Sequence, residues 1–185
     1  MGGDSRLNLL LTHEASKPLV TQPWYETLTH LLAPLGVRTF EATSGQAAVD
    51  VIERHPIHLA VVDSRLPAIS GINVLRLIQK LNQQPALAGN QAEGGPAFRV
   101  QMNVEERTSQ QGMQRRIEVK FEGNPASANG PVVILIAPPQ QDDQLLHEAL
   151  KFNAFSVLSE PVDLNVMLDL MARALKRFHR NQWPQ

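Results

Sequence analysis

The chain has 185 residues, with 17 Lys and Arg against 18 Asp and Glu, and a formal net charge of −1. This balance excludes nucleic-acid binding through a broad basic surface, because phosphate contacts need a clear excess of positive charge. Hydrophobic residues make up 43% of the chain, which indicates a globular fold rather than disorder. Cysteine is absent, so disulfides, thiolate metal sites and cysteine nucleophiles are excluded.

The sequence also bears on the cellular compartment of the protein. No apolar run approaches the roughly 20 residues that a membrane-spanning helix needs. Residues 1–4 lack the basic and apolar segments that open a secretory signal. Together with the absence of cysteine, which fits a reducing environment, these features lead us to expect a cytoplasmic protein with neither a membrane nor a nucleic acid as partner.

The first half of the chain alternates short apolar runs with amphipathic helical segments. The predicted strands are the apolar runs at residues 7–11, 37–42 and 57–62. A helix is predicted after each of them. Thr21 is placed to cap the first helix and Ser44 to cap the second, and the third covers residues 72–81.

The second half repeats this alternation after a long interruption. Strands are predicted at residues 131–136 and 155–158, with a helix between them that begins at Asp142 or Asp143. A last helix with one apolar stripe covers residues 163–179. Strand and helix thus alternate five times, which predicts an α/β fold: a doubly wound, five-stranded parallel sheet with helices on both faces. Functional residues of such sheets lie at the carboxyl ends of the strands.

The interruption is an insertion at residues 84–130. Its ends are rich in Gly, Pro, Ala and Asn, but its middle holds two runs in which apolar and polar residues alternate. We predict a β-hairpin with strands at 97–105 and 114–122. A lone hairpin is marginally stable in water, so its apolar face is expected to pack on the parent domain or on a partner. The alternative is a disordered insertion with accidental alternation.

A loop motif follows the third predicted strand. Asp63 ends that strand, Leu66 and Pro67 follow after two variable residues, and Gly71 comes four residues after the proline. A further proline, Pro161, follows the fifth predicted strand. With the fivefold strand–helix order, this pattern resembles the receiver domain of response regulators, the CheY-like family of two-component signal transduction.

The resemblance covers most of residues 7–83 and 131–180 and omits the insertion. It implies a single flavodoxin-like domain over residues 1–185 that carries the inserted hairpin. It also implies that Asp63 corresponds to the phosphoacceptor aspartate of the family, which accepts a phosphoryl group with the help of Mg²⁺ and several neighbouring side chains.

The metal-binding positions differ from that family pattern. An acidic pair after the first strand holds Mg²⁺ in the family, and here Thr12 and His13 stand at those positions. Neither is a good ligand for a hard cation, which prefers carboxylate oxygens. Glu14, one position further on, and Asp63 remain as weak candidate ligands. We expect no metal or other cofactor, with Mg²⁺ binding only if the phosphorylated alternative below holds.

The phosphoryl-binding positions differ as well. The hydroxyl residue that ends the family's fourth strand corresponds to Ile136, and the aromatic residue of its fifth strand corresponds to Val157. The lysine before the proline corresponds to Glu160. Two unit charges about 4 Å apart interact by roughly 4 kcal/mol at an effective dielectric constant of about 20. Glutamate in place of lysine therefore turns attraction of a phosphoryl group into repulsion of similar size.

The sequence thus favours a non-enzymatic pseudo-receiver that signals through protein–protein interaction without conventional phosphorylation. By the resemblance, a protein partner or a second copy would bind the face formed by residues 142–153, 155–158 and 163–179. The inserted hairpin is the second candidate surface, since an exposed strand edge can recruit another strand. One alternative is a phosphorylatable response regulator that accepts a phosphoryl group on Asp63. Another is a small-molecule or proton sensor that uses the remodelled pocket around Thr12, His13, Asp63 and Glu160, with His13 paired to Asp63 in the proton-sensing version.

Overall fold

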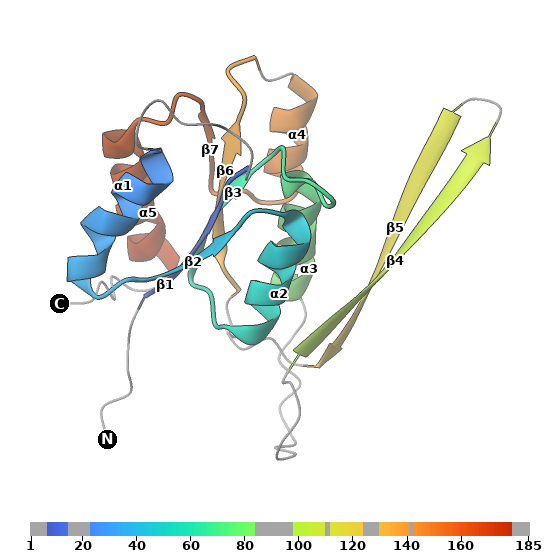
Figure 1. Ribbon diagram of the computed structural model, residues 1–185, viewed down its shortest axis with the longest axis horizontal. Helices are drawn as coiled ribbons and strands as arrows, with labels where there is room; N and C mark the ends of the chain where they lie inside the picture. Colours follow the sequence, from blue (N-terminus) through green and yellow to red (C-terminus); the bar gives the residue numbers. More distant parts are fainter. Residues whose placement is uncertain are drawn as a thin grey trace.

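The computed structural model describes residues 7–14, 23–83, 98–109, 112–123, 130–140 and 143–178. Its main body is a five-stranded parallel sheet with helices on both faces, and an antiparallel hairpin extends away from that body (Figure 1). Four predicted features lie outside the described residues: the Thr21 cap, the start of the first hairpin strand at residue 97, a helix start at Asp142, and the end of the last helix at His179.

The strands of the sheet are β1 (Asn8–Thr12), β2 (Arg38–Ala42), β3 (Leu59–Asp63), β6 (Val132–Ala137) and β7 (Ser156–Ser159). The helices are α1 (Trp24–Leu32), α2 (Gly45–Arg54), α3 (Gly71–Gln83), α4 (Asp143–Lys151) and α5 (Leu164–Phe178), with a short 3₁₀ helix η1 (Ala33–Leu35) after α1. The strand order is β2–β1–β3–β6–β7, and all pairs in this sheet are parallel. The predicted doubly wound, flavodoxin-like architecture is confirmed.

Apolar side chains cover both faces of this sheet. In β1, Leu10 packs into the layer formed with α2 and α3, whereas Leu9 and Leu11 pack into the opposite layer, which contains α1 and α5. Figure 1 shows the same division, with α1 and α5 on one side of the sheet and α2, α3 and α4 on the other. Every residue of β3 and β6 is buried, as expected of central strands in a parallel sheet.

Capping side chains accept hydrogen bonds from backbone N–H groups in the first turn of two helices. The Oγ of Ser44 accepts a hydrogen bond of 3.1 Å from the backbone N–H of Ala47 at the start of α2, as predicted. Asp163 caps α5 by accepting from the N–H of Asn165 at 2.8 Å. By contrast, α1 begins after Pro23 without a side-chain cap.

The insertion contributes β4 (Phe98–Ser109) and β5 (Gly112–Gly123), which pair antiparallel from Phe98 opposite Gly123 to Ser109 opposite Gly112. Both strands extend further toward the turn than the predicted 97–105 and 114–122. The insertion joins the end of α3 to the start of β6, so it connects at the amino-terminal edge of the sheet. That edge is opposite the one that carries Asp63. In the described part of the chain, no helix is both long and apolar enough to span a membrane.

Removing the Ser44 hydroxyl tests how much the cap of α2 contributes to the fold. We expect Ser44→Ala to lower the free energy of unfolding by about 1 kcal/mol, because the N–H of Ala47 loses its acceptor. Urea denaturation followed by circular dichroism measures this change. Ser44→Thr keeps an acceptor oxygen and is the matched control, and equal losses in both variants would contradict the role assigned to the hydroxyl.

Candidate functional site

The carboxyl ends of four strands bring the predicted site positions together. Asp63 ends β3 and pairs in register with Ile136 of β6. Thr12 ends β1. Glu160 directly follows β7, and its N–H donates a hydrogen bond of 2.9 Å to the carbonyl of Ala137. Four residues that lie far apart in the sequence therefore meet at one edge of the sheet.

Asp63 is anchored through its backbone as well as its side chain. Asp63 is only 6% exposed, and Thr12 is fully buried. The backbone N–H of Asp63 donates a 2.8 Å hydrogen bond to the Oγ1 of Thr12. The hydroxyl of Thr12 thus satisfies a buried N–H group that would otherwise lack an acceptor. This structural role leaves Thr12 a poor substitute for an acidic metal ligand.

The loop after Asp63 is fixed to two helix starts. The N–H of Gly71, at the start of α3, donates to the carbonyl of Ser64 at 3.2 Å, and the N–H of Gly45, at the start of α2, donates to the carbonyl of Pro67 at 3.2 Å. A Cβ atom on Gly71 would overlap the carbonyl of Asp63, so only glycine fits this approach. The glycine of the motif is thus needed for close packing of α3 against the loop.

Arg65 is the group that dominates the electrostatics of the site. Its Nη2 lies 2.7 Å from the Oε2 of Glu160 and 3.5 Å from the Oδ2 of Asp63, and its Nε lies 3.4 Å from Oδ1 of Asp63. Its backbone N–H also donates to that Oδ1, at 2.8 Å. One guanidinium therefore bridges the carboxylates of Asp63 and Glu160.

The pKa of Arg65 reflects this position between two carboxylates. Burial by itself lowers the pKa, but hydrogen bonding and Coulomb attraction to Asp63, with a further contribution from Glu160, outweigh it and raise the pKa above arginine's usual value. Both carboxylates thus favour the charged form of the Arg65 guanidinium.

The ring of His13 contacts Tyr25 and Glu41. It stacks on Tyr25, with centroids 3.8 Å apart and planes 4° from parallel, and its Nε2 lies 3.8 Å from the Oε2 of Glu41. The pKa of Tyr25 is raised by burial and by the nearby carboxylates of Glu26 and Glu41. The hypothesis of a proton sensor built on a His13–Asp63 pair was wrong in its geometry, because the acidic neighbour of His13 is Glu41.

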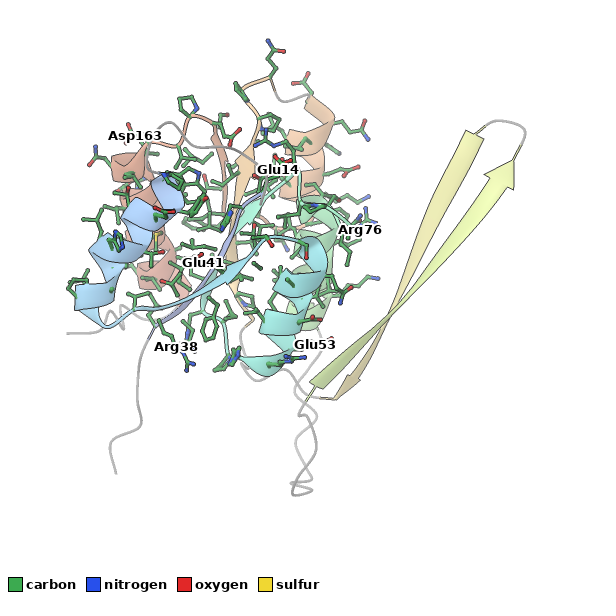
Figure 2. All side chains as sticks on the ribbon, viewed as in Figure 1. Glu14, Arg38, Glu41, Glu53, Arg76 and Asp163 are labelled. Atoms are coloured by element: carbon green, nitrogen blue, oxygen red, sulfur yellow. The ribbon has the colours of Figure 1, made fainter. Side chains whose placement is uncertain are left out.

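The other predicted positions have mixed surroundings. Glu14 is exposed, and Figure 2 shows it at the same edge of the molecule as Asp163. Ile136 is buried in the layer with α1 and α5, whereas Val157 is partly buried and packs against the layer with α2 and α3. These two side chains bring apolar surface, not hydroxyl or aromatic groups, to the end of the sheet.

The donor groups do not fit the magnesium site of the family. The carboxylate of Asp63 is engaged by Arg65, the hydroxyl of Thr12 accepts a backbone N–H, and His13 lies against Tyr25. Among the residues that the structure describes, no group of three His, Cys, Asp or Glu side chains is arranged to hold a metal ion. A hard cation needs several oxygen ligands at once, and these residues do not offer them.

Reasoning from the sequence did not select Arg65. The sequence feature that could have indicated it is Glu160. Two carboxylates close together repel each other unless a cation lies between them, and Arg65 is the basic residue of the loop after Asp63. Arg65 and Glu160 are separated by 95 residues in the chain. Which way the long side chain of Arg65 turns is therefore decided by the folded structure.

Replacing Thr12 tests its hydrogen bond to Asp63. We expect Thr12→Val to lower the free energy of unfolding by about 1–3 kcal/mol, because the buried N–H of Asp63 is left without an acceptor while the side-chain shape is kept. Thr12→Ser retains the hydroxyl and should lose less. The measurement is chemical denaturation of both variants, and a Val variant as stable as wild type would overturn the assignment.

The segment around Asp63 is similar in sequence to a known family. Residues 22–96, which include Asp63 and its loop, match the family model of the response regulator receiver domain. No curated protein matches the chain.

Solved structures share its fold. The signal receiver domain of an HD domain-containing protein from Pseudomonas fluorescens Pf-5 is 18% identical, with a TM-score of 0.59 over 95% of this chain and 98% of that chain. A CheY-like response regulator receiver domain protein from Methanospirillum hungatei JF-1 is 13% identical, with a TM-score of 0.60 and the same coverage. The receiver domain of the Francisella response regulator 1452 is 14% identical, with a TM-score of 0.57 over 93% of this chain and 98% of that one.

At these identities the solved structures establish the fold, and the family model adds the sequence motif around Asp63. The five-stranded domain of this chain thus has the fold of CheY-like receiver domains, and residues 22–96 carry the sequence features of the response regulator receiver domain, a domain of two-component signal transduction.

Proposed function

We propose that this receiver domain signals through protein–protein contacts without conventional phosphorylation of Asp63. The observation that carries the proposal is the position of Arg65 between Asp63 and Glu160. In the family pattern, the lysine before the proline provides a cation for an incoming phosphoryl group. Here the cation comes from the loop itself and is already paired with two carboxylates.

The pairing reduces the reactivity of Asp63 as a nucleophile. Its Oδ1 accepts from both the backbone N–H and the Nε of Arg65, and its Oδ2 faces the Nη2 of the same guanidinium. A carboxylate stabilised by charge-assisted hydrogen bonds is a weaker nucleophile, and attack on a phosphodonor would first require these contacts to break.

The charge balance also opposes a phosphorylated state. Asp63 and Glu160 together carry two negative charges against the one positive charge of Arg65, which leaves the cluster at −1. An acyl phosphate on Asp63 has a charge of about −2 in place of the carboxylate's −1, so the cluster would become more negative. Phosphoryl transfer is catalysed mainly by neutralising such charge, and in the part of the chain that the structure describes no metal site is available to do so.

One observation favours the alternative of a working phospho-switch. A guanidinium is a good phosphate ligand, so Arg65 has the chemistry to turn from Glu160 toward a phosphoryl group on Asp63. In that case the Arg65–Glu160 pair would be the resting arrangement of a switch. The two functions differ in whether Asp63 forms a phosphoryl adduct at all, which can be measured directly.

Protein partners are the expected route of signalling. On the face formed by α4, β7 and α5, Leu150 is 70% exposed and Val166 is 43% exposed. Exposed aliphatic side chains on these two helices provide apolar contact area that a protein partner would bury. The β4–β5 hairpin is the second surface on which we expect a partner to bind.

Exposure to a small phosphodonor separates the two functions. We expect the intact mass of the protein to remain unchanged after incubation with acetyl phosphate and Mg²⁺, because Arg65 is paired with the carboxylate of Asp63 and the described residues around it form no metal site. A conventional receiver domain treated in parallel is the positive control. An adduct of one phosphoryl group that disappears in Asp63→Asn would overturn the proposal in favour of the phospho-switch.

The strength of the Arg65 bridge can be measured with a double-mutant cycle. We expect Arg65→Ala and Glu160→Gln to show a coupling energy of about 0.5–1 kcal/mol in urea denaturation, since both side chains are partly exposed and solvent screens the pair.

The matched control is the pair of Arg173 and Asp169 on α5, which has the same 2.7 Å separation but lies further out in solvent. Its coupling should be smaller, near about 0.3 kcal/mol. A coupling between Arg65 and Glu160 that does not exceed this control would mean that the bridge does little to hold the loop.

A further inference from the structure

The register of the hairpin divides its residues between two faces. On one face, apolar residues stand opposite one another: Val100 and Phe121, Met102 and Val119, Val104 and Ile117. On the other face, the opposed residues are polar: Arg99 and Glu122, Gln101 and Lys120, Asn103 and Glu118, Glu105 and Arg116. The hairpin is thus amphipathic along this whole stretch.

Only some of the charged residues on the polar face stand opposite a residue of opposite charge. Two of the opposed pairs join residues of opposite sign, at the two ends of the stretch. Between them, Glu118 stands opposite the neutral Asn103, and Lys120 stands opposite the neutral Gln101. The centre of β5 therefore carries one negative and one positive charge without a charged residue directly across in β4.

The sequence of β5 is complementary to itself in the antiparallel direction. From Arg116 to Glu122 it reads positive, apolar, negative, apolar, positive, apolar, negative. If a second copy of β5 runs antiparallel with Val119 opposite Val119, then Glu118 stands opposite Lys120 of the other copy. Arg116 then stands opposite the other copy's Glu122, so every charged pair in the segment joins opposite signs.

This complementarity selects one register. A slip of two residues in one direction places Arg116 opposite Lys120 and Glu118 opposite Glu118 of the other copy. A slip of two in the other direction places Glu118 opposite Glu122 and Lys120 opposite Lys120, so both slips bring like charges together. A slip of one residue sets apolar positions opposite charged ones. The central register is therefore the one that pairs all four charged residues of the segment with opposite signs while keeping apolar positions opposite apolar positions.

The same test applied to β4 gives a poorer match. When β4 is paired with itself around Met102, Arg99 stands opposite Glu105, but the pair between them is Gln101 and Asn103, which are both neutral. When it is paired around Asn103, Arg99 stands opposite Arg107, which is repulsive. Of the two strand edges of the hairpin, β5 is the one whose sequence fits a copy of itself.

We propose that the outer edge of β5 pairs antiparallel with β5 of a second copy of this chain. The two hairpins then form one four-stranded antiparallel sheet in the order β4–β5–β5–β4, with a two-fold axis at Val119. An isolated hairpin is marginal in water, whereas three or more strands with an apolar face are stable. A two-fold contact of this kind is closed, so it produces dimers and does not continue into fibres.

The hairpin joins the domain at the amino-terminal edge of the sheet, away from Asp63. Pairing through β5 therefore leaves the Arg65 cluster untouched. The partner at the outer edge of β5 is a second copy of the chain, and its binding does not depend on whether Asp63 is phosphorylated. A failure of one proposal leaves the other standing, since one is read from a phosphoryl adduct and the other from mass in solution.

Charge swapping at residues 118 and 120 tests the proposal. The 20.5 kDa chain should sediment as a dimer, and Glu118→Lys or Lys120→Glu should each raise the dissociation constant by about tenfold or more, because each turns attraction across the two-fold axis into repulsion. The double swap should restore the dimer. An equimolar mixture of the two single variants should form a heterodimer, since one then carries two lysines and the other two glutamates.

Arg107→Glu is the matched control, because it changes the net charge as Lys120→Glu does and lies opposite a neutral residue, Gln114, but on β4. It should leave the dimer unchanged. Circular dichroism melts confirm that each variant keeps its folded domain. A wild-type chain that is monomeric throughout the micromolar range overturns the proposal. So does a dimer that both single variants leave intact, which would be held by the apolar hairpin face or by α4, β7 and α5.

Discussion

Burial of the parallel sheet on both faces is the constraint from which the rest of the structure follows. The central strand β3 has no exposed residue, so polar groups are tolerated only where the strand ends. Asp63 is at that position, and the N–H of the next residue, Ser64, donates across to the carbonyl of Ile136 on β6. The apolar layers fix where the aspartate lies, and Thr12 and Arg65 then fix what its backbone and side chain are bonded to.

The loop after Asp63 is held from three directions. Gly45 ties it to α2, Gly71 brings α3 against it, and Arg65 joins it to Glu160 in the turn before α5. Each of these contacts uses a different kind of interaction: a main-chain hydrogen bond, close packing and an ion pair. The loop therefore connects the end of β3 to α2, to α3 and to the turn before α5.

How far the sequence predicts this structure depends on the physical origin of each feature. Apolar runs and the Ser44 cap act locally, so the elements and the fold were predictable, and parallel strand ends had to bring Thr12 and Glu160 toward Asp63. The expected pairing of His13 with Asp63 was wrong because neighbouring residues of an extended chain point to opposite faces. Thr12 bonds to Asp63, whereas His13 contacts Tyr25 of α1. The bridging direction of Arg65 depends on rotamers and on a partner 95 residues away, which no local pattern encodes.

The place at which the insertion leaves the domain has a thermodynamic consequence. The end of α3 and the start of β6 are already held by the packed sheet, so residues 84–130 only lengthen a connection whose ends are fixed. The entropy of closing a loop rises with the logarithm of its length, by about 0.6 kcal/mol for each doubling. A receiver domain can therefore acquire a long segment at this crossover with little loss of stability, and that segment is free to diverge in sequence while the fold around Asp63 is preserved.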